Sequence, residues 1–376
     1  MEHPLFCLNV FCKLHKKDVN SNDWYKKEGY YATKAFGKVQ RFKCKKCGKG
    51  FSTQSFSLDY YAKRVISYEE LLKKIVSTSS TRDISRDFKI STETVQNKVM
   101  RLAHQAIGLQ EEMKTHISVG ENIVADGFES YCVSQYFPNN IHLLAGKDSQ
   151  FLYYTNYVTL RRKGRMTDKQ KARREELEKL YWAPYKGIEC SFIELLDDIL
   201  SIHERSSLNP LVLYTDKKYD YVKALNFNKD IALLVKQNKI KHIRINSKRA
   251  RTVFNPLFAV NYLDRQIRKD MANHVRETVC FSRNVSNCME RLMVYFMYHN
   301  YLKIYREKQK RKDKRTHAEV AGLDKKVLKR GIKSIFTKRR FLTLENIKGF
   351  ILHLWKRQLF TPLKCRIDYI PRYVLA

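Results

Sequence analysis

The sequence contains no long apolar run and little proline. No stretch approaches the roughly 18 consecutive apolar residues that indicate a membrane-spanning helix, so we expect no membrane span. The N-terminal segment MEHPLFCLNVFC lacks a basic stretch followed by an apolar one, and we expect no secretory signal peptide. Only 7 prolines and no Gly/Ser-rich linker occur in 376 residues, so domain boundaries are visible only as changes of composition.

Acidic residues are far outnumbered by basic ones. The chain has 73 Lys and Arg against 38 Asp and Glu, a formal net charge of +35. Such a charge does not specify a fold, but it predicts a polyanionic partner, and nucleic acid fits better than a lipid surface. A hydrophobic content of 43% argues against global disorder. Nine cysteines, an odd number without a secretion signal, indicate a reducing compartment.

Composition divides the chain into four regions. Residues 1–56 contain paired cysteines, and residues 57–112 have the pattern of short helices. Residues 117–305 alternate apolar strand-like runs with amphipathic helices, and residues 306–376 form a basic C-terminal region. A helical insertion is expected near 161–207, because its segment CSFIELLDDILSIHERS places four apolar side chains on one helix face.

The cysteine pairs predict a metal site. Cys7 and Cys12 form a C-x4-C pair, and Cys44 and Cys47 form a C-x2-C pair within RFKCKKCGKGFS. Two such knuckles can complete a tetrahedral four-sulfur site for one structural Zn²⁺, that is, a zinc ribbon. The alternative is four buried or disulfide-bonded cysteines, which the paired spacing disfavours. The other five are expected to be small core residues: Cys132, Cys190, Cys280, Cys288 and Cys365.

The segment TRDISRDFKISTETVQNKVMRLAHQAI suggests a helix-turn-helix. Ile84 and Phe88 would pack the first helix, and Ser91 would be the N-cap of the second. The second helix would then present side chains suited to base edges and phosphates in the major groove of DNA. The alternative is a small helical bundle with a solvated polar face. The predicted DNA-contacting residues are Thr92, Thr94, Gln96, Asn97, Lys98 and Arg101.

The central region predicts a mixed sheet. NIVADGFESY is interpreted as a strand that ends at Asp126, and two further strands follow it. LNPLVLYTDKKYD is interpreted as a buried strand that ends at Asp216, followed by a helix near 218–227. One more strand and a helix from about 257 to 271, which carries Asp264, complete the series. This order fits an α/β, RNase H-like catalytic domain.

Carboxylates at the rim of a sheet suggest metal chemistry. Two aspartates brought together repel each other, and bound Mg²⁺ relieves the repulsion. Two ions about 4 Å apart can activate a water or a 3′-hydroxyl and stabilise the leaving oxygen. The alternative for Asp216 is a turn residue that caps the next helix. For the pair in this topology, on a chain of this charge, we favour metal binding.

With these motifs the chain resembles insertion-sequence transposases that combine an N-terminal zinc ribbon with a DDE-type RNase H-like catalytic domain. The resemblance runs from residue 5 to about residue 305. RFKCKKCGKGFS is similar to the second knuckle of the ribbon, VADGFES to the first catalytic strand and LYTDKKYDYVKAL to the second. The family's third motif is similar to VNYLDRQIRKDMANHVRETVCFSRN. The knuckles and the third motif are specific, whereas ADG and TD alone are weak.

The resemblance implies an activity. Such enzymes bind the terminal inverted repeats of a mobile element, cleave its ends by metal-dependent hydrolysis and join the 3′-hydroxyls to target DNA. It implies Mg²⁺ or Mn²⁺ as two-ion cofactor, double-stranded DNA as partner, a homodimer or higher oligomer on DNA, and a prokaryotic, nucleoid-associated cytoplasmic location. The alternatives are a non-catalytic zinc-ribbon and helix-turn-helix regulator, a domesticated transposase, or a nuclease that cuts without joining.

The third acidic residue departs from the family pattern. Many relatives carry Glu where Asp264 stands here, so the shorter side chain requires its helix to lie closer to the metals. Glu290, in NCMERLMVYF, is the rival, and Asn261 is a further candidate because some relatives have Asn. Asn–x–x–Asp–Arg spacing favours Asp264. His242 and Arg265 are candidate contacts to the scissile phosphate.

Two basic runs, 161–174 and 306–315, are solvated helix faces or tracks for a DNA backbone. Trp355 lies in a basic and aromatic segment near the C-terminus. It is suited to stacking on an unpaired base, but packing in a helix core is the favoured role.

Overall fold

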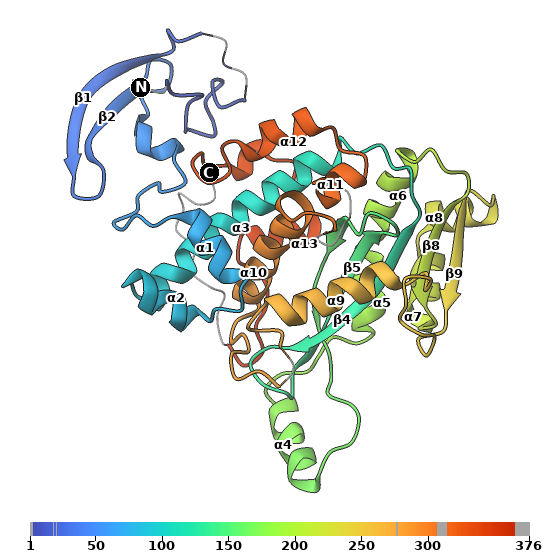
Figure 1. Cartoon of the computed structure of the whole chain (residues 1–376). Helices are drawn as coiled ribbons and strands as arrows, with labels where there is room; N and C mark the ends of the chain where they lie inside the picture. Colours follow the sequence, from blue (N-terminus) through green and yellow to red (C-terminus); the bar gives the residue numbers. More distant parts are fainter. Residues whose placement is uncertain (1–2, 18, 20, 276, 307–313, 365–376) are drawn as a thin grey trace.

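The fold is described from a computed structural model, for residues 3–364 except 18, 20, 276 and 307–313. The N-terminal part is a three-stranded antiparallel sheet in the order β1-β2-β3, with β1 at Tyr25–Thr33, β2 at Gly37–Cys44 and β3 at Gly50–Ser52. It has its own small apolar cluster around Trp24 and Phe42, and it projects from the main body in Figure 1, which it contacts through Phe6 and Phe341. A short 3-10 helix, Thr53–Phe56, leads out of it.

The main body is built on a six-stranded mixed sheet. The strands are β4 (Ile123–Tyr131), β5 (Pro138–Gly146), β6 (Leu152–Thr155), β7 (Val158–Thr159), β8 (Leu211–Asp216) and β9 (Ile240–Ile245). Their order is β6-β5-β4-β8-β9, with β7 paired to β5. The chain forms β4, β5 and β6 as an antiparallel meander, and β8 and β9 add in parallel on the other side of β4.

The strand prediction is confirmed in order, with one correction. The expected strand with Asp126 does not end there, because β4 continues to Tyr131 and pairs with β5 along its whole length. Val124, Ala125 and Phe128 are buried, so buried apolar positions of this strand continue beyond Asp126. Asp216 does end β8, as predicted.

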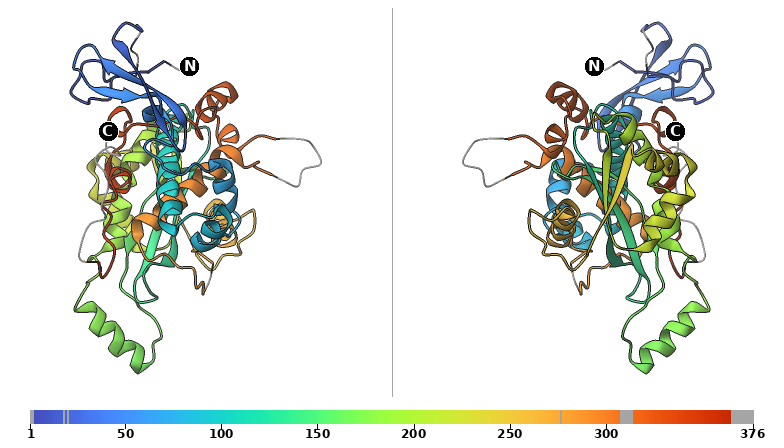
Figure 2. Two further views of the ribbon diagram at one scale, coloured as in Figure 1. Left: turned by 90° about the vertical axis from the view of Figure 1, so that its left-hand side faces the viewer. Right: turned by 90° about the vertical axis from the view of Figure 1, so that its right-hand side faces the viewer.

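Helices cover both faces of the sheet. α5 (Gly187–Ile193), α6 (Leu196–Glu204), α7 (Tyr219–Phe227) and α8 (Lys229–Lys236) lie on one side in Figure 2, whereas α9 (Phe258–Asp270) and α10 (Val285–Met297) lie on the other. The predicted helices near 218–227 and 257–271 are confirmed as α7 and α9. The predictions did not include α8.

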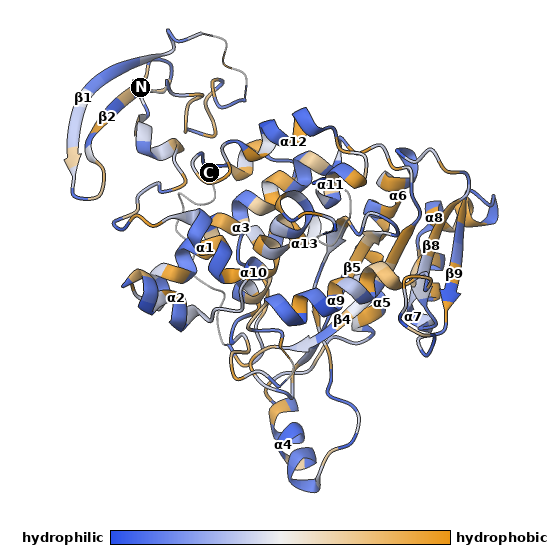
Figure 3. Ribbon diagram, viewed as in Figure 1, coloured by the Kyte–Doolittle hydropathy of each residue, from blue (hydrophilic) through white to orange (hydrophobic). Residues whose placement is uncertain are grey.

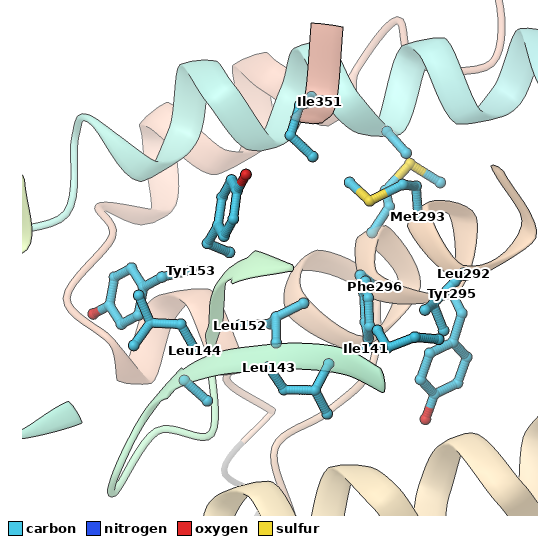
Figure 4. Packing of buried hydrophobic residues seen from close by; sticks show 14 of the residues in the cluster. Ile141, Leu143, Leu144, Leu152, Tyr153, Leu292, Met293, Tyr295, Phe296 and Ile351 are labelled. Carbon is cyan, nitrogen blue, oxygen red and sulfur yellow. The ribbon is translucent and has the colours of Figure 1, made fainter. Parts of the chain in front are cut away.

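One long helix ties the N-terminal helices to the sheet. α1 (Tyr68–Ile75) and α2 (Thr81–Phe88) are short, but α3 (Thr92–Lys114) has 23 residues and is buried from Lys98 to Gln110. A single apolar cluster runs from Leu58 through the sheet to Trp355, so packing does not break between the predicted regions 57–112 and 117–305. Figure 4 shows Leu143 and Leu144 of β5 in the same cluster as Leu292 and Phe296 of α10.

The predicted recognition face of α3 is only partly exposed. Ser91 is its N-cap, as predicted, and its side chain accepts a hydrogen bond from the Thr94 backbone N–H. Thr92 and Asn97 are exposed, and Thr94 and Gln96 are half-buried.

Two of the predicted DNA contacts are wrong. Lys98 is buried in an ion pair with Asp59. Arg101 is buried too, and donates to the backbone carbonyls of Leu58 and Tyr60 at 2.9 and 2.7 Å. Both side chains bind polar groups of the segment that leads out of the N-terminal sheet. This segment crosses over α3, and its buried polar groups require hydrogen-bond partners.

The predicted insertion is helical. α4 (Asp168–Glu178) projects from the body in Figure 1, and Figure 3 shows it as mostly hydrophilic, whereas β5 and β8 are largely hydrophobic. The first basic run, 161–174, therefore falls on the approach to α4 and its first turns. The apolar face predicted for α5 and α6 is confirmed, since all four side chains are buried: Phe192, Leu195, Leu196 and Ile199.

The C-terminal region packs on the body. A π-helical turn, Tyr298–Leu302, continues α10, and α11 (His317–Val320), α12 (Lys325–Ile332), a 3-10 turn at Leu342–Leu344 and α13 (Gly349–Trp355) follow. Trp355 is buried and stacks on His104 with ring centroids 4.2 Å apart, so it is a core residue. Most of the second basic run, 307–313, lies outside the described residues. Among the described helices, none has the length and apolar character to cross a membrane.

We expect α3 to carry much of the stability of the main body. Leu109 is completely buried on α3, so Leu109→Ala is expected to lower the free energy of unfolding by about 2–5 kcal/mol. Leu180→Ala is the matched control, because Leu180 is 75% exposed and its loss should change stability by less than about 0.5 kcal/mol. Chemical denaturation of both variants measures the difference. Equal effects would contradict the central role of α3.

Candidate functional site

The parallel pairing of β4 with β8 places two aspartates side by side. Ile123 pairs with Leu213 and Val124 with Tyr214. Following this register two residues further brings Asp126 to the level of Asp216, on the neighbouring strand. The two side chains therefore start at the same level of neighbouring strands, just beyond the last pair of the ladder.

The third aspartate comes from a helix. Asp264 lies on α9, which packs against β4 and β5. Leu263 and Ile267 on the buried face of α9 hold the helix to the sheet, and Asp264 is half-buried beside them. Arg268, one turn later, donates to the backbone carbonyl of Glu129 on β4 at 2.8 Å and fixes the position of the helix on that strand.

The pKa values of these carboxyls reflect their proximity. Burial and the neighbouring Asp216 raise the pKa of Asp126 to about 6. Burial and the neighbouring Asp126 raise the pKa of Asp264 to about 7, although Arg268 and Arg251 lower it. Asp126 thus interacts with both other aspartates, and it is the central member of the group.

Backbone groups and one lysine partly compensate the negative charge. The Asp216 carboxylate accepts a hydrogen bond from the Lys218 backbone N–H at 2.8 Å, and the Asp126 carboxylate accepts one from the Gly127 N–H at 2.7 Å. The Lys218 ammonium lies 3.6 Å from Glu129 and lowers the pKa of Asp126. Gly127 is required by space, since a Cβ there would lie 1.9 Å from Oδ1 of Asn140.

The two candidate phosphate contacts have different surroundings. His242 on β9 contacts the neighbouring strand β8, where its Nε2 lies 2.8 Å from the Thr215 hydroxyl. Burial and Arg244 lower the pKa of His242 to about 4, so the ring is neutral at pH 7. Arg265 is exposed on α9, next to Asp264.

The rival third acid is occupied elsewhere. Glu290 is buried on α10, where it accepts a hydrogen bond from Gln96 at 2.9 Å and forms an ion pair with Arg357 at 3.1 Å. Neither partner is among the groups that shift the pKa values of Asp126 and Asp264. The structure therefore groups Asp264, and not Glu290, with Asp126. Asn261 lies one turn before Asp264 on the same helix.

The four N-terminal cysteines form a group that can hold a metal ion. The sulfur atoms of Cys7, Cys12, Cys44 and Cys47 all lie within 4.8 Å of one another, and those of Cys7 and Cys47 are 3.4 Å apart. A tetrahedral site with metal–sulfur bonds of about 2.3 Å separates its sulfurs by roughly 3.8 Å, so the spacing fits. Although burial opposes it, the Lys49 backbone N–H and polar neighbours lower the pKa of Cys47 to about 7, which favours its thiolate, whereas burial raises the pKa of Cys7 and of Cys12.

The three aspartates are gathered less tightly. In the described part of the chain, the cysteines are the one set of three or more His, Cys, Asp or Glu side chains that meets the spacing for a single ion. Of the remaining cysteines, Cys132 and Cys288 are core residues as predicted, whereas Cys190 and Cys280 are exposed, contrary to expectation. Cys365 lies outside the described residues.

Comparison of the sequence with models of known protein families and with curated proteins finds no match. Function therefore has to be argued from the geometry of these two sites.

We expect one metal ion to be bound tightly per chain. Cys47→Ser should remove it and lower the melting temperature of the N-terminal sheet, because the free energy of metal binding would no longer contribute to folding. Cys190→Ser, at an exposed cysteine outside the group, is the control and should keep the ion. Elemental analysis of the purified variants measures the metal content. A full equivalent of metal in Cys47→Ser would contradict the assignment.

The raised pKa values predict a pH dependence of stability in buffer free of divalent ions. Asp264 has a pKa of about 7 in the folded chain, above the value of about 3.9 in an unfolded chain. Between these values the folded state binds more protons, so the free energy of unfolding falls as the pH rises. Asp264→Asn should remove this penalty and stabilise the chain by on the order of 1 kcal/mol at pH 8.

The gain should be smaller at pH 5, where wild-type Asp264 is still protonated. Thermal melts of wild type and variant from pH 5 to pH 8 measure it. The exposed Asp230→Asn is the control and should show no such trend. A gain that does not grow with pH would show that Asp264 is not under electrostatic strain.

Proposed function

We propose that the chain is a DNA transposase that binds the terminal inverted repeats of a mobile element and catalyses metal-dependent DNA cleavage and strand transfer. The observation that carries the proposal is the mutual influence of Asp126, Asp216 and Asp264, which arrive from two parallel strands and a helix. Three like charges at one place are unfavourable for stability. Such an arrangement is typical of a site that binds cations.

The topology supports an RNase H-like catalytic domain. The sheet has three antiparallel strands followed by two parallel ones, and the succession of strands and helices along the chain agrees with the one expected from the sequence. Ligands of mixed sheets collect where the strand direction and order change, and β4 is the strand at which this sheet changes from antiparallel to parallel pairing.

The donor set fits Mg²⁺ or Mn²⁺. Both ions prefer carboxylate oxygens, and all three candidate ligands are aspartates. Asp126, which interacts with both others, would hold the ions together with Asp216 and Asp264.

Two bound ions would supply an activated water or 3′-hydroxyl and stabilisation of the leaving oxygen. The chain itself contributes positioning. The Lys218 and Gly127 N–H groups orient the carboxylates of Asp216 and Asp126, and Arg268 holds α9 against β4. Exposed Arg265, beside Asp264, is placed to contact the phosphate that is cut. No covalent enzyme intermediate is needed, so catalysis is mainly orientation and charge neutralisation.

The N-terminal sheet fits a zinc ribbon. Zn²⁺ is the ion that a site of four thiolates selects among common divalent metals, and there it would be structural. Together with the net charge of +35, this supports double-stranded DNA as the partner. A helix-turn-helix role for α2 and α3 would use Thr92, Thr94, Gln96 and Asn97. Joining two DNA ends requires two active sites, so a dimer or higher oligomer on DNA is expected by analogy.

Asparagine variants test the proposal. Asp126→Asn, Asp216→Asn and Asp264→Asn should each lower Mg²⁺-dependent cleavage of DNA that carries the element's ends by at least about 100-fold, because each removes a ligand charge. DNA binding without divalent ions should remain within about threefold of wild type, since neutralising a carboxylate adds no repulsion to phosphates. Asp230→Asn is the control and should cleave normally. Gel assays of cleavage and strand transfer provide the measurements.

Glu290→Gln separates the two candidates for the third acid. It should retain cleavage but lower stability, because it leaves the half-buried Arg357 without its ion-pair partner. Full cleavage by Asp126→Asn would refute the metal site. Specific DNA binding by the wild type with no cleavage in Mg²⁺ or Mn²⁺ would support the alternative of a non-catalytic regulator or domesticated transposase.

A further inference from the structure

A cavity of about 480 Å³ lies between the N-terminal helices and the loop that follows α9. One wall comes from the start of α2 and the first turns of α3, including Arg82, Thr92 and Gln96. The opposite wall is the segment from Val279 to Arg283 and the first half of α10, including Arg291. The segment belongs to RETVCFSRN, the last part of the third motif, and none of its residues has a role in the carboxylate site described above.

The lining of this cavity is cationic. Three arginines contribute to it, namely Arg82, Arg283 and Arg291, and no aspartate, glutamate or histidine does. Arg82 and Arg283 are exposed at the rim, whereas Arg291 is only 5% exposed. Hydroxyl and amide groups complete the polar part, so the chemistry of the cavity suits an oxyanion with several acceptor oxygens.

Arg291 is a buried cation without a carboxylate partner among the described residues. Its guanidinium donates to the Ser79 carbonyl at 2.8 Å and the Thr81 hydroxyl at 3.4 Å, and its Nε has no hydrogen-bond partner. The preceding residue, Glu290, forms its ion pair with Arg357 instead. Burial lowers the pKa of Arg291 to about 10, so it remains charged at neutral pH. A buried guanidinium of this kind is normally matched by an anion.

The cavity is connected to the carboxylate site through β4. The loop after α9 is fixed to the end of this strand, where Tyr131 donates to the Thr278 carbonyl at 3.1 Å and Ser130 bonds His274 at 3.0 Å. Asp126 lies four residues before Ser130, a separation of roughly 13 Å along a strand. Along the axis of a duplex, a DNA strand rises by that distance in about four nucleotide steps.

We propose that this cavity, lined by Arg82, Arg283 and Arg291, binds a backbone phosphate of a DNA strand a few nucleotides from the phosphate at the three aspartates. That the bound anion is a phosphate of a DNA strand rests on the proposed function. That the cavity binds an anion rests on Arg291, which has no carboxylate partner among the described residues. Phe281 and Val279 supply an apolar side for the attached sugar or base. The RETVCFSRN motif then positions the substrate beside the helix that carries Asp264.

The first experiment measures binding of the 5′-phosphorylated thymidine dinucleotide pTpT to the full chain by calorimetry. Arg82→Gln/Arg283→Gln should weaken it at least tenfold, and the exposed side chains make this variant safe for folding. Lys329→Gln/Arg330→Gln on α12 removes the same charge at exposed positions outside the cavity and should change affinity less than twofold. Thymidine, which lacks phosphate, should not bind.

The second experiment uses a labelled duplex that carries the DNA flanking the gene, without divalent ions. Arg82→Gln/Arg283→Gln should reduce the slope of log affinity against log salt by about 1, as expected for one lost phosphate contact, relative to the α12 control. Arg291→Gln, checked for folding by circular dichroism, should behave in the same way.

The outcomes separate this inference from the proposed function. Equal pTpT binding by wild type and Arg82→Gln/Arg283→Gln, or no pTpT binding by the wild type, overturns the inference even if the chain cleaves DNA. Arginine-dependent pTpT binding by a chain that never cleaves DNA with Mg²⁺ or Mn²⁺ supports the phosphate site and overturns the proposed function.

Discussion

The pairing of β4 with β8 is the interaction on which the rest of the structure depends. β4 is antiparallel to β5 on one edge and parallel to β8 on the other, so it joins a hairpin meander to a crossover unit. The long connection between β7 and β8, which holds the insertion with α4, α5 and α6, is needed to bring β8 back in parallel. The same pairing brings Asp126 and Asp216 to one level, so the fold and the site have a single geometric origin.

Charge is unbalanced both over the whole chain and at individual sites within it. The chain as a whole is strongly positive, yet its sheet gathers three aspartates where one would be more stable. The opposite imbalance occurs at Arg291, a buried cation that has no carboxylate partner among the described residues. Each of these local excesses costs folding free energy. They are understandable together if the missing charges come from outside, as cations at one place and a phosphate at the other.

Much of the site could be predicted because its signals are local. Apolar runs that end in a charged residue located Asp216, and helical periodicity located α9 with Asp264 within a residue or two at each end. Cysteine spacing identified the four sulfurs, since a C-x2-C and a C-x4-C pair leave few other geometries. The succession of strands and helices along the chain followed from the apolar and amphipathic segments, whereas the order of the strands within the sheet was not predicted.

The errors arose where distant segments decide the environment. Lys98 and Arg101 have the sequence pattern of an exposed helix face. Both are buried because Lys98 forms an ion pair with Asp59 and Arg101 donates to two backbone carbonyls, all from a segment about 40 residues earlier in the chain. The end of β4 was placed too early because Asp126 interrupts an apolar run that its neighbours on β5 continue. The arginine cavity has no signature in the sequence, since its residues come from four separate stretches of the chain.

The length of α3 has a mechanical consequence. Its 23 residues form one unbroken helix of roughly 34 Å, with the first turns at the arginine cavity and the remainder in the core against α10. An element that reads DNA at one end of such a helix cannot swing independently of the sheet at the other. If the chain acts on DNA as proposed, this helix would fix the distance between the place where DNA is held and the bond that lies over the aspartates.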